Sequence, residues 1–191
     1  MDERFMKEAL VLAKEAFDAG EVPVGCVIVR GEEIVGRGRN RREGAKNALA
    51  HAEIEAINDA CRCLGGWRLW ECTLYVTLEP CPMCAGAIVN ARIPRVVYGA
   101  SDSKCGAVRS VCGLFDMQFN HHPKVESGVL EEECGALLTA FFQKLRQYIR
   151  NSVNMLHFFC LAILRMLKMA ARYGNHNSVC NQIPKTIQAV L

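Results

Sequence analysis

The sequence predicts an α/β fold, in which a β-sheet is covered by helices. Segments with the apolar pattern of strands alternate along the chain with segments whose apolar residues recur every three or four positions. Apolar residues make up 51% and charged residues 23% of the 191 residues, as in an ordinary globular protein. This length suits one well-packed domain and leaves little room for a second.

The first half of the chain predicts two helices and a strand pair. In order, these are a helix over residues 5–17, strands over 24–30 and 34–35, and a helix over 50–62. Gly20 is placed to end the first helix, and Gly31, followed by two acidic residues, suits the tight turn between the strands.

The second half predicts three strands and two helices, expected as strand 73–77, helix 80–91, strands 95–99 and 125–129, and a helix from 131 through 142. The run Thr73–Thr77 is rich in β-branched and aromatic residues and therefore suits a central strand. Pro80 suits the first turn of a helix, and the acids of Glu131–Glu133 suit the positive end of a helix dipole.

The sequence carries no sign of export or of membrane insertion. Its N-terminus opens directly into an amphipathic pattern, and it has no apolar stretch of the roughly 20 residues that a membrane span needs. Without an export signal, the eleven cysteines are expected as reduced thiols or metal ligands, and their odd number disfavours a complete disulfide framework. These features predict a cytoplasmic protein.

The net charge of +3 is unevenly distributed. Residues 1–146 carry 18 basic and 20 acidic side chains, whereas residues 147–191 carry five basic and no acidic ones. A nucleic-acid site on the first part must therefore be a local patch. Residues 37–46 hold five basic residues and one acid, which suits phosphate contacts, although a solvated loop has the same composition.

Two short segments indicate a catalytic zinc site, His51-Ala-Glu53 and Pro80-Cys-Pro-Met-Cys84. Cysteines three residues apart at the start of a helix place two thiolates on one face, where the helix dipole favours their ionised form. His51 adds a third ligand, so that zinc keeps one open position for water, as catalytic zinc does. Glu53 can reach that water without being a ligand and can carry its proton to a substrate.

Each part has a plainer interpretation when taken alone. A single C-x-x-C is as often structural or redox-active, and a single histidine on a helix is usually packed or exposed. Together, in the order H-x-E…P-C-x-x-C, they match the signature of the zinc-dependent nucleobase deaminases.

Longer matching segments make the resemblance more specific. Over about residues 1–146 the chain resembles the bacterial tRNA adenosine deaminases of the cytidine deaminase superfamily. The matching text includes 21–25, 38–41, 51–53, 74–87, 98–100 and 132–138. The resemblance implies a three-layer α/β/α fold with a mixed five-stranded sheet, a homodimer, and conversion of adenosine to inosine at wobble position 34 of a tRNA. It also implies one zinc ion per subunit, bound by His51, Cys81 and Cys84, with Glu53 moving protons as zinc-bound hydroxide attacks C6.

The resemblance further implies a set of contacts to the anticodon stem-loop, made by Asn40, Asp102, Lys104, Phe142 and Arg146. Asn40 matches a residue that contacts the target nucleotide, and Asp102 one near its sugar, where a 2′-hydroxyl needs an acceptor. An aromatic beside basic residues, as at 141–146, can stack on a splayed base. Without the resemblance, Asp102 would be an ordinary loop residue.

Two other functions remain open from the sequence. One is a deaminase of free bases or nucleosides, which would need neither the basic patch nor the phenylalanines of the last helix. The other is an inactive, RNA-binding subunit, which the presence of Glu53 disfavours. Residues 147–191 match nothing in the family and are expected as a C-terminal extension. They could lengthen the last helix, fold back on the domain, form an amphipathic surface helix, or carry no selected structure.

Overall fold

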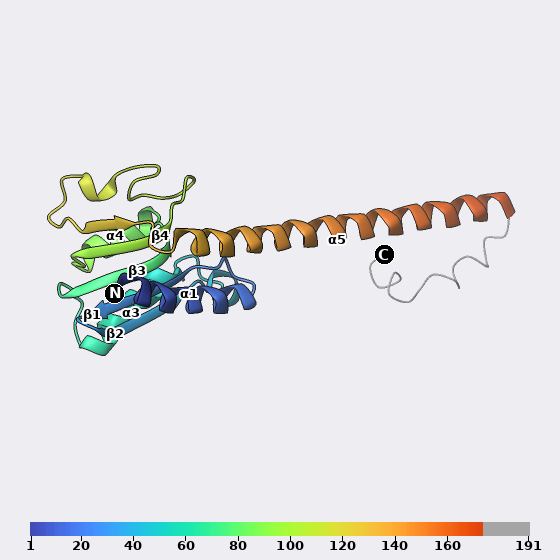
Figure 1. Ribbon diagram of the computed structural model, residues 1–191. Coiled ribbons are helices and arrows are strands. Elements are labelled where there is room, and N and C mark those ends of the chain that lie inside the picture. The colour runs from blue at the N-terminus through green and yellow to red at the C-terminus, as the bar shows by residue number, and fades with distance from the viewer. Residues whose placement is uncertain (174–191) are drawn as a thin grey trace. The chain divides into compact units, whose positions relative to one another are not determined.

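The structure of the protein is a computed structural model, and residues 1–173 are described (Figure 1). The side chains at positions 154, 156–158, 167 and 169–173 lie outside the described part. The chain divides into two units, Met1–Phe142 and a second that begins at Gln143. The predicted domain boundary at residue 146 remains a prediction.

The first unit is built on a mixed five-stranded sheet, as predicted. Its strands are β1 (Gly25–Arg30), β2 (Glu33–Arg39), β3 (Cys72–Leu78), β4 (Arg95–Ala100) and β5 (Lys124–Ser127). They lie in the order β2-β1-β3-β4-β5. Strand β1 is antiparallel to both β2 and β3, whereas β3, β4 and β5 are parallel.

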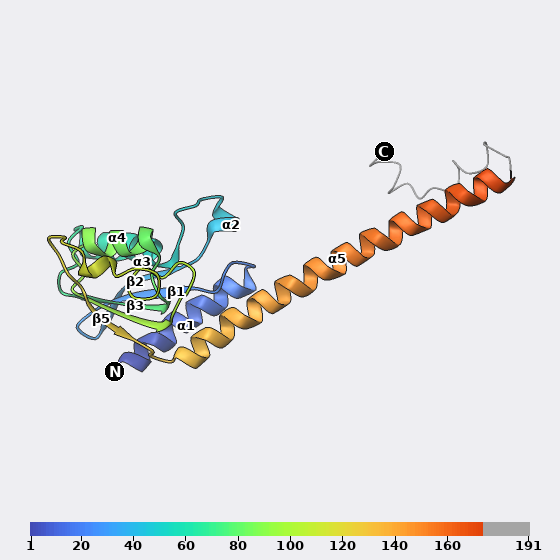
Figure 2. The same cartoon turned by 90° about the horizontal axis from the view of Figure 1, so that it is seen from above.

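Helices cover both faces of the sheet, which confirms the predicted three-layer α/β/α arrangement. The helices of this unit are α1 (Asp2–Asp18), α2 (Arg42–Ala45), α3 (Ala52–Leu64), α4 (Pro82–Asn90) and the start of α5 (Glu131–Tyr173), with a 3-10 turn at Leu114–Asp116. Figure 2 shows α3 and α4 together on one face of the sheet, with α1 on the other.

Alternation along the strands divides the core between these two faces. Because successive strand side chains point to opposite sides, Val27, Tyr75 and Val97 face α1, where they pack with Phe5 and Met6. The intervening residues pack under α3 and α4, in a larger cluster that includes Ile28, Leu74, Val76, Val96 and Tyr98. Helices α3 and α4 therefore pack on the same continuous part of the hydrophobic core.

Two helices begin two residues later than predicted. The sequence predicted helices from residues 50 and 80, but α3 begins at Ala52 and α4 at Pro82. The residues just before them, His51 and Cys81, have extended backbones with ψ of 153° and 171°. Strand β2 is longer than predicted, and neither α2 nor the 3-10 turn was predicted.

The last helix, α5, runs for 43 residues from Glu131 to Tyr173. Of the alternatives for the C-terminal extension, lengthening of the last helix is therefore what residues 147–173 do, while residues 174–191 lie outside the described part of the chain. Within residues 1–173, no helix combines the length and the apolar character needed to cross a membrane.

Candidate active site

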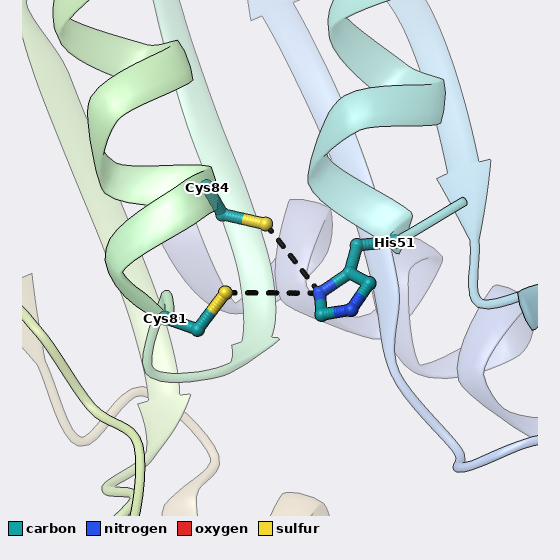
Figure 3. A group of neighbouring side chains, drawn as sticks. All are labelled: His51, Cys81 and Cys84. Carbon is teal, nitrogen blue, oxygen red and sulfur yellow. Dashed lines mark hydrogen bonds between the residues drawn. The ribbon is translucent and has the colours of Figure 1, made fainter. Parts of the chain in front are cut away.

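Three side chains from two helices converge at one end of the sheet. The ligand atoms of His51, Cys81 and Cys84 all lie within 4.8 Å of one another, and they form the one such group that the described side chains contain. Nδ1 of His51 is 3.8 Å from Sγ of Cys81 and 3.6 Å from Sγ of Cys84 (Figure 3). The three residues that the sequence predicts as metal ligands are thus brought together.

Helix ends place these side chains. His51 is the N-cap of α3 and Cys81 the N-cap of α4, and Cys84 lies one turn further along α4. Because both helices pack on the same sheet face, their N-termini meet at the cluster (Figure 3). The positive ends of the two helix dipoles favour negative charge there, and thiolates in particular.

The cluster has the chemistry and spacing of a zinc site. A nitrogen ligand about 2.0 Å and a sulfur ligand about 2.3 Å from a tetrahedral zinc ion lie about 3.5 Å apart, close to the two observed separations. A hydrogen bond from the Cys84 thiol lowers the pKa of Cys81 to about 4, so one sulfur is a thiolate already. The same bond, with burial, raises the pKa of Cys84. On a zinc ion held here, these three side chains would leave a fourth tetrahedral position for water.

Glu53 lies in the first turn of α3, beside the cluster. Only 4% of the residue is exposed, and its carboxyl group interacts with the Cys84 thiol. Burial raises the pKa of Glu53 to about 7, with a further contribution from the neighbouring Cys81 thiolate. A buried carboxyl group with this pKa can both accept and return a proton near neutral pH.

Asn40 is buried and bonded to the backbone on both sides of its amide group. Its Nδ2 donates to the Val22 carbonyl oxygen at 3.1 Å, and its Oδ1 accepts from the Ala52 amide at 3.1 Å. Ala52 follows His51 directly, so Asn40 helps to fix the start of α3. Its contact with the target nucleotide remains a prediction.

Two buried carboxylates whose roles the sequence analysis missed bind other segments of the chain, Glu21 the short helix α2 and Glu79 a loop. Glu21 is 4% exposed and accepts from the backbone amides of Glu43 and Gly44, at 3.1 and 2.7 Å, inside the basic patch of residues 37–46. Glu79 is 2% exposed and binds the loop of residues 101–110. Burial alone would raise the pKa of Glu79, but hydrogen bonds from Ser110 and from backbone amides bring it below its usual value. The only sequence signal for either was an acid within an apolar segment.

The predicted substrate residues Asp102 and Lys104 lie in the loop that Glu79 holds. The Asp102 carboxylate accepts from the backbone amides of Lys104 and Cys105, at 2.9 and 3.2 Å, and Lys104 is exposed. This is the turn geometry of an ordinary loop aspartate. A contact of either residue with a sugar remains a prediction.

The other two predicted substrate residues lie on α5. The Phe142 ring is 40% exposed and meets Phe141 edge-on, with ring centroids 5.4 Å apart, and Phe141 packs against Phe17. One phenylalanine is thus packed and the other open to solvent. Arg146 belongs to the second unit, and its predicted contact with RNA stays a prediction.

The remaining cysteines and histidines stay apart from the cluster. The ten cysteines among residues 1–173 are all free, and Cys26, Cys72 and Cys134 are buried. Cys112 lies in an exposed loop before the 3-10 turn. His121 and His122 are hydrogen-bonded to the backbone carbonyl groups of Ile93 and Phe115.

Comparisons with known proteins agree with this site. A family model for MafB19-like deaminases matches residues 1–146. A tRNA-specific adenosine deaminase from Bacillus subtilis is 53% identical over 147 residues, which are 76% of this chain and 91% of that protein. One from Haemophilus influenzae is 49% identical over 148 residues, 76% of this chain and 86% of the relative.

Solved structures show the same relationship. A structure from a study of A-to-I editing by tRNA:A34 deaminases is 47% identical, with a TM-score of 0.68 over 70% of this chain and 98% of its own. A guanine deaminase from Bacillus subtilis is 34% identical, with a TM-score of 0.51 over 76% and 93% of the two chains. The predicted resemblance is therefore confirmed, and the chain belongs to the MafB19-like deaminase family, within the cytidine-deaminase-like superfamily.

Proposed function

We propose that the protein hydrolyses adenosine to inosine at the wobble position, base 34, of a tRNA, with release of ammonia. The observation that carries this proposal is the cluster of His51, Cys81 and Cys84 with Glu53 beside it. The relatives that are about half identical over 147 to 149 residues support the choice of tRNA, since their names specify it.

His51, Cys81 and Cys84 are the residues that would hold one zinc ion in each subunit. A zinc ion held there would supply a water molecule of lowered pKa as the nucleophile. The protein's own part is to keep two sulfurs and one imidazole nitrogen in place at the N-termini of α3 and α4.

Glu53 would carry the protons of the reaction. Attack of water on C6 of adenine forms a C–O bond and requires a proton at the ring nitrogen, and loss of ammonia requires a second proton on the exocyclic amine. A single buried carboxyl group beside the cluster could take one proton from the water and deliver it to the ring nitrogen. It could then take the second proton from the new C6 hydroxyl and deliver it to the amine, which leaves as ammonia when the C–N bond breaks. Its burial keeps competing bulk water away from the transfer.

The RNA would approach along the surfaces that flank the cluster. The exposed Arg42 and Lys46 of the basic patch suit phosphates, and the exposed ring of Phe142 suits a splayed base. Asn40, Asp102, Lys104 and Arg146 complete the expected contact set. A cytoplasmic homodimer is part of the same proposal.

The test is inosine formation in an anticodon stem-loop that carries A34. Wild type should form inosine, and zinc-loaded Glu53→Gln should lose at least about 100-fold in rate, as expected when a general acid–base is removed. Guanine and adenine as free bases serve as the competing substrates, because the guanine deaminase likeness favours them as the alternative. Turnover of a free base without inosine formation in RNA would contradict this proposal and favour a deaminase of free bases.

A further inference from the structure

Glu79 lies between the cluster of His51, Cys81 and Cys84 and the loop of residues 101–110. It follows the last residue of β3 and stands two residues before Cys81. Because β3 and β4 are parallel neighbours, residue 79 and the start of the loop lie side by side, and the Glu79 amide donates to the Ala100 carbonyl oxygen at 2.8 Å.

The buried Glu79 carboxylate accepts five hydrogen bonds, all from this one loop. Oε1 accepts from the backbone amides of Val108, Arg109 and Ser110, at 3.1, 2.7 and 2.9 Å. Oε2 accepts from the Asp102 amide at 3.1 Å and from the Ser110 hydroxyl. The carboxylate therefore binds both ends of the segment that carries Lys104.

The segment between these two anchor points is a compact turn with bonds of its own. The Gly106 amide donates to the Asp102 carbonyl oxygen at 2.8 Å, and the Asp102 carboxylate caps the amides of Lys104 and Cys105. The turn can therefore keep its shape by itself. Its position relative to Cys81 depends on Glu79, on a backbone bond from the Ala107 amide to the Pro80 carbonyl oxygen at 2.9 Å, on bonds from the Arg109 guanidinium to Ser127 and Val125, and on the burial of Ala107 and Val108 in the core.

Gly106 shows how closely the loop is fitted to the carboxylate. A Cβ at this position would lie 2.3 Å from Oε2 of Glu79 and 2.6 Å from the Asp102 carbonyl oxygen, so a side chain there would displace one or the other. Two residues far apart in the sequence are thus matched to each other in space.

From this geometry we infer that Glu79 is a positioning residue for the substrate. It fixes the loop bearing Asp102 and Lys104 at a set place beside the metal cluster, so that the nucleotide meets the loop and the cluster together. The inference rests on the proposed function, since it concerns how the same site holds its RNA. A carboxylate suits this task because it only accepts hydrogen bonds, and every group that faces it in the loop donates.

The test compares three variants on the A34 stem-loop, with zinc content measured in each. Glu79→Gln keeps the shape but turns an NH₂ group toward donors, and Gly106→Ala acts from the loop side with Glu79 and Cys81 unchanged. Both should raise KM by about tenfold or more, with kcat reduced less than KM is raised and zinc content as in wild type. Ser110→Ala removes one hydroxyl donor of the five and should have the smallest effect.

Amide hydrogen exchange gives a readout that does not depend on substrate. Residues 101–110 should exchange faster in Glu79→Gln and Gly106→Ala, while α3 and α4 stay as protected as in wild type. An unchanged KM in both variants would overturn the inference, as would loss of zinc in proportion to activity, since Glu79 would then support the metal cluster instead. If wild type itself forms no inosine, the proposed function fails, and this inference fails with it.

Discussion

Gly38 on β2 lies directly against the first residue of α3, Ala52. A Cβ on Gly38 would stand 2.1 Å from the Ala52 carbonyl oxygen and 2.4 Å from the Ala56 amide nitrogen. Since His51 immediately precedes Ala52, the missing Cβ of Gly38 lets the start of α3, and His51 with it, lie close to β2.

We expect Gly38→Ala to weaken both stability and metal binding. The added methyl group has to push α3 away from β2, and overpacking of this kind costs about 1–3 kcal/mol. Chemical denaturation and metal analysis of the purified protein check the two effects. Gly86→Ala is the matched control, because a Cβ on this glycine of α4 meets nothing within 4 Å and should leave zinc content unchanged. Equal effects of the two variants would contradict the expectation.

Replacement of either cysteine of the cluster should abolish metal binding. In Cys81→Ser and Cys84→Ser a hydroxyl group replaces the thiolate that zinc prefers, so zinc should fall from about one ion per chain to a small fraction of that. Cys112→Ser, which changes an exposed thiol outside the cluster, should keep its zinc. Metal analysis and inosine formation should fall together, and a cysteine variant that keeps full zinc would exclude that residue as a ligand.

The N-terminus should confer acid-sensitive stability through Asp2. Its carboxylate accepts hydrogen bonds from the Arg95 guanidinium at 3.0 and 2.9 Å and from the Tyr75 hydroxyl at 2.7 Å, and the Arg95 bonds chiefly lower the pKa of Asp2. A lowered pKa means that the unfolded chain takes up this proton first as the pH falls. The stabilisation is therefore complete above the unfolded pKa of about 3.9 and is lost as the pH falls through the folded pKa.

The measurement is urea unfolding of wild type and Asp2→Asn across this range. The difference in unfolding free energy should be constant from about pH 6 to 8 and shrink below about pH 4. Glu126→Gln, which removes the more exposed partner of Arg95, should cost less, within the roughly 0–1 kcal/mol of a surface ion pair. A difference for Asp2→Asn that grows toward low pH would refute this account.

Substitutions at the two neighbouring phenylalanines of α5 should affect different properties, mainly stability at Phe141 and RNA binding at Phe142. Phe141 packs edge-on against Phe17, so Phe141→Ala should lower the unfolding free energy by about 1–3 kcal/mol. Phe142 exposes 40% of its surface, so Phe142→Ala should cost less stability but weaken binding of the stem-loop by about 1–3 kcal/mol, the size of one lost stacking contact. Thermal unfolding and fluorescence anisotropy with labelled RNA measure the two quantities, and the reverse assignment would contradict the proposed stacking.

Removal of residues 151–191 should leave deamination intact. The cluster of His51, Cys81 and Cys84, together with Glu53, lies within Met1–Phe142, so the chemistry proposed for the site uses residues of the first unit. The check is the rate of inosine formation by a chain that ends at Arg150. Soluble, zinc-loaded protein without activity would show that the extension is part of the functional unit.

The sequence predicted the sheet and the meeting of His51, Cys81 and Cys84 because both depend on short, strong patterns. Apolar and β-branched runs bounded by turn residues predicted five strands, and the motif H-x-E…P-C-x-x-C predicted which three side chains would lie together. The roles of Glu21 and Glu79 could not be predicted, because they depend on hydrogen bonds from backbone amides that are distant in the sequence and come close only in the folded chain. For the same reason Asn40 showed no structural role until its amide was seen to bridge Val22 and Ala52.

The N-termini of α3 and α4 meet on one face of the sheet, and this has a consequence for the protein without a metal. The three donor atoms are held by elements whose packing does not involve the ion, so the apo form is expected to keep its fold, unlike a zinc finger, which unfolds when its metal is removed. Binding of the proposed zinc ion would therefore require little ordering of the chain, and we expect that the metal can be exchanged without unfolding.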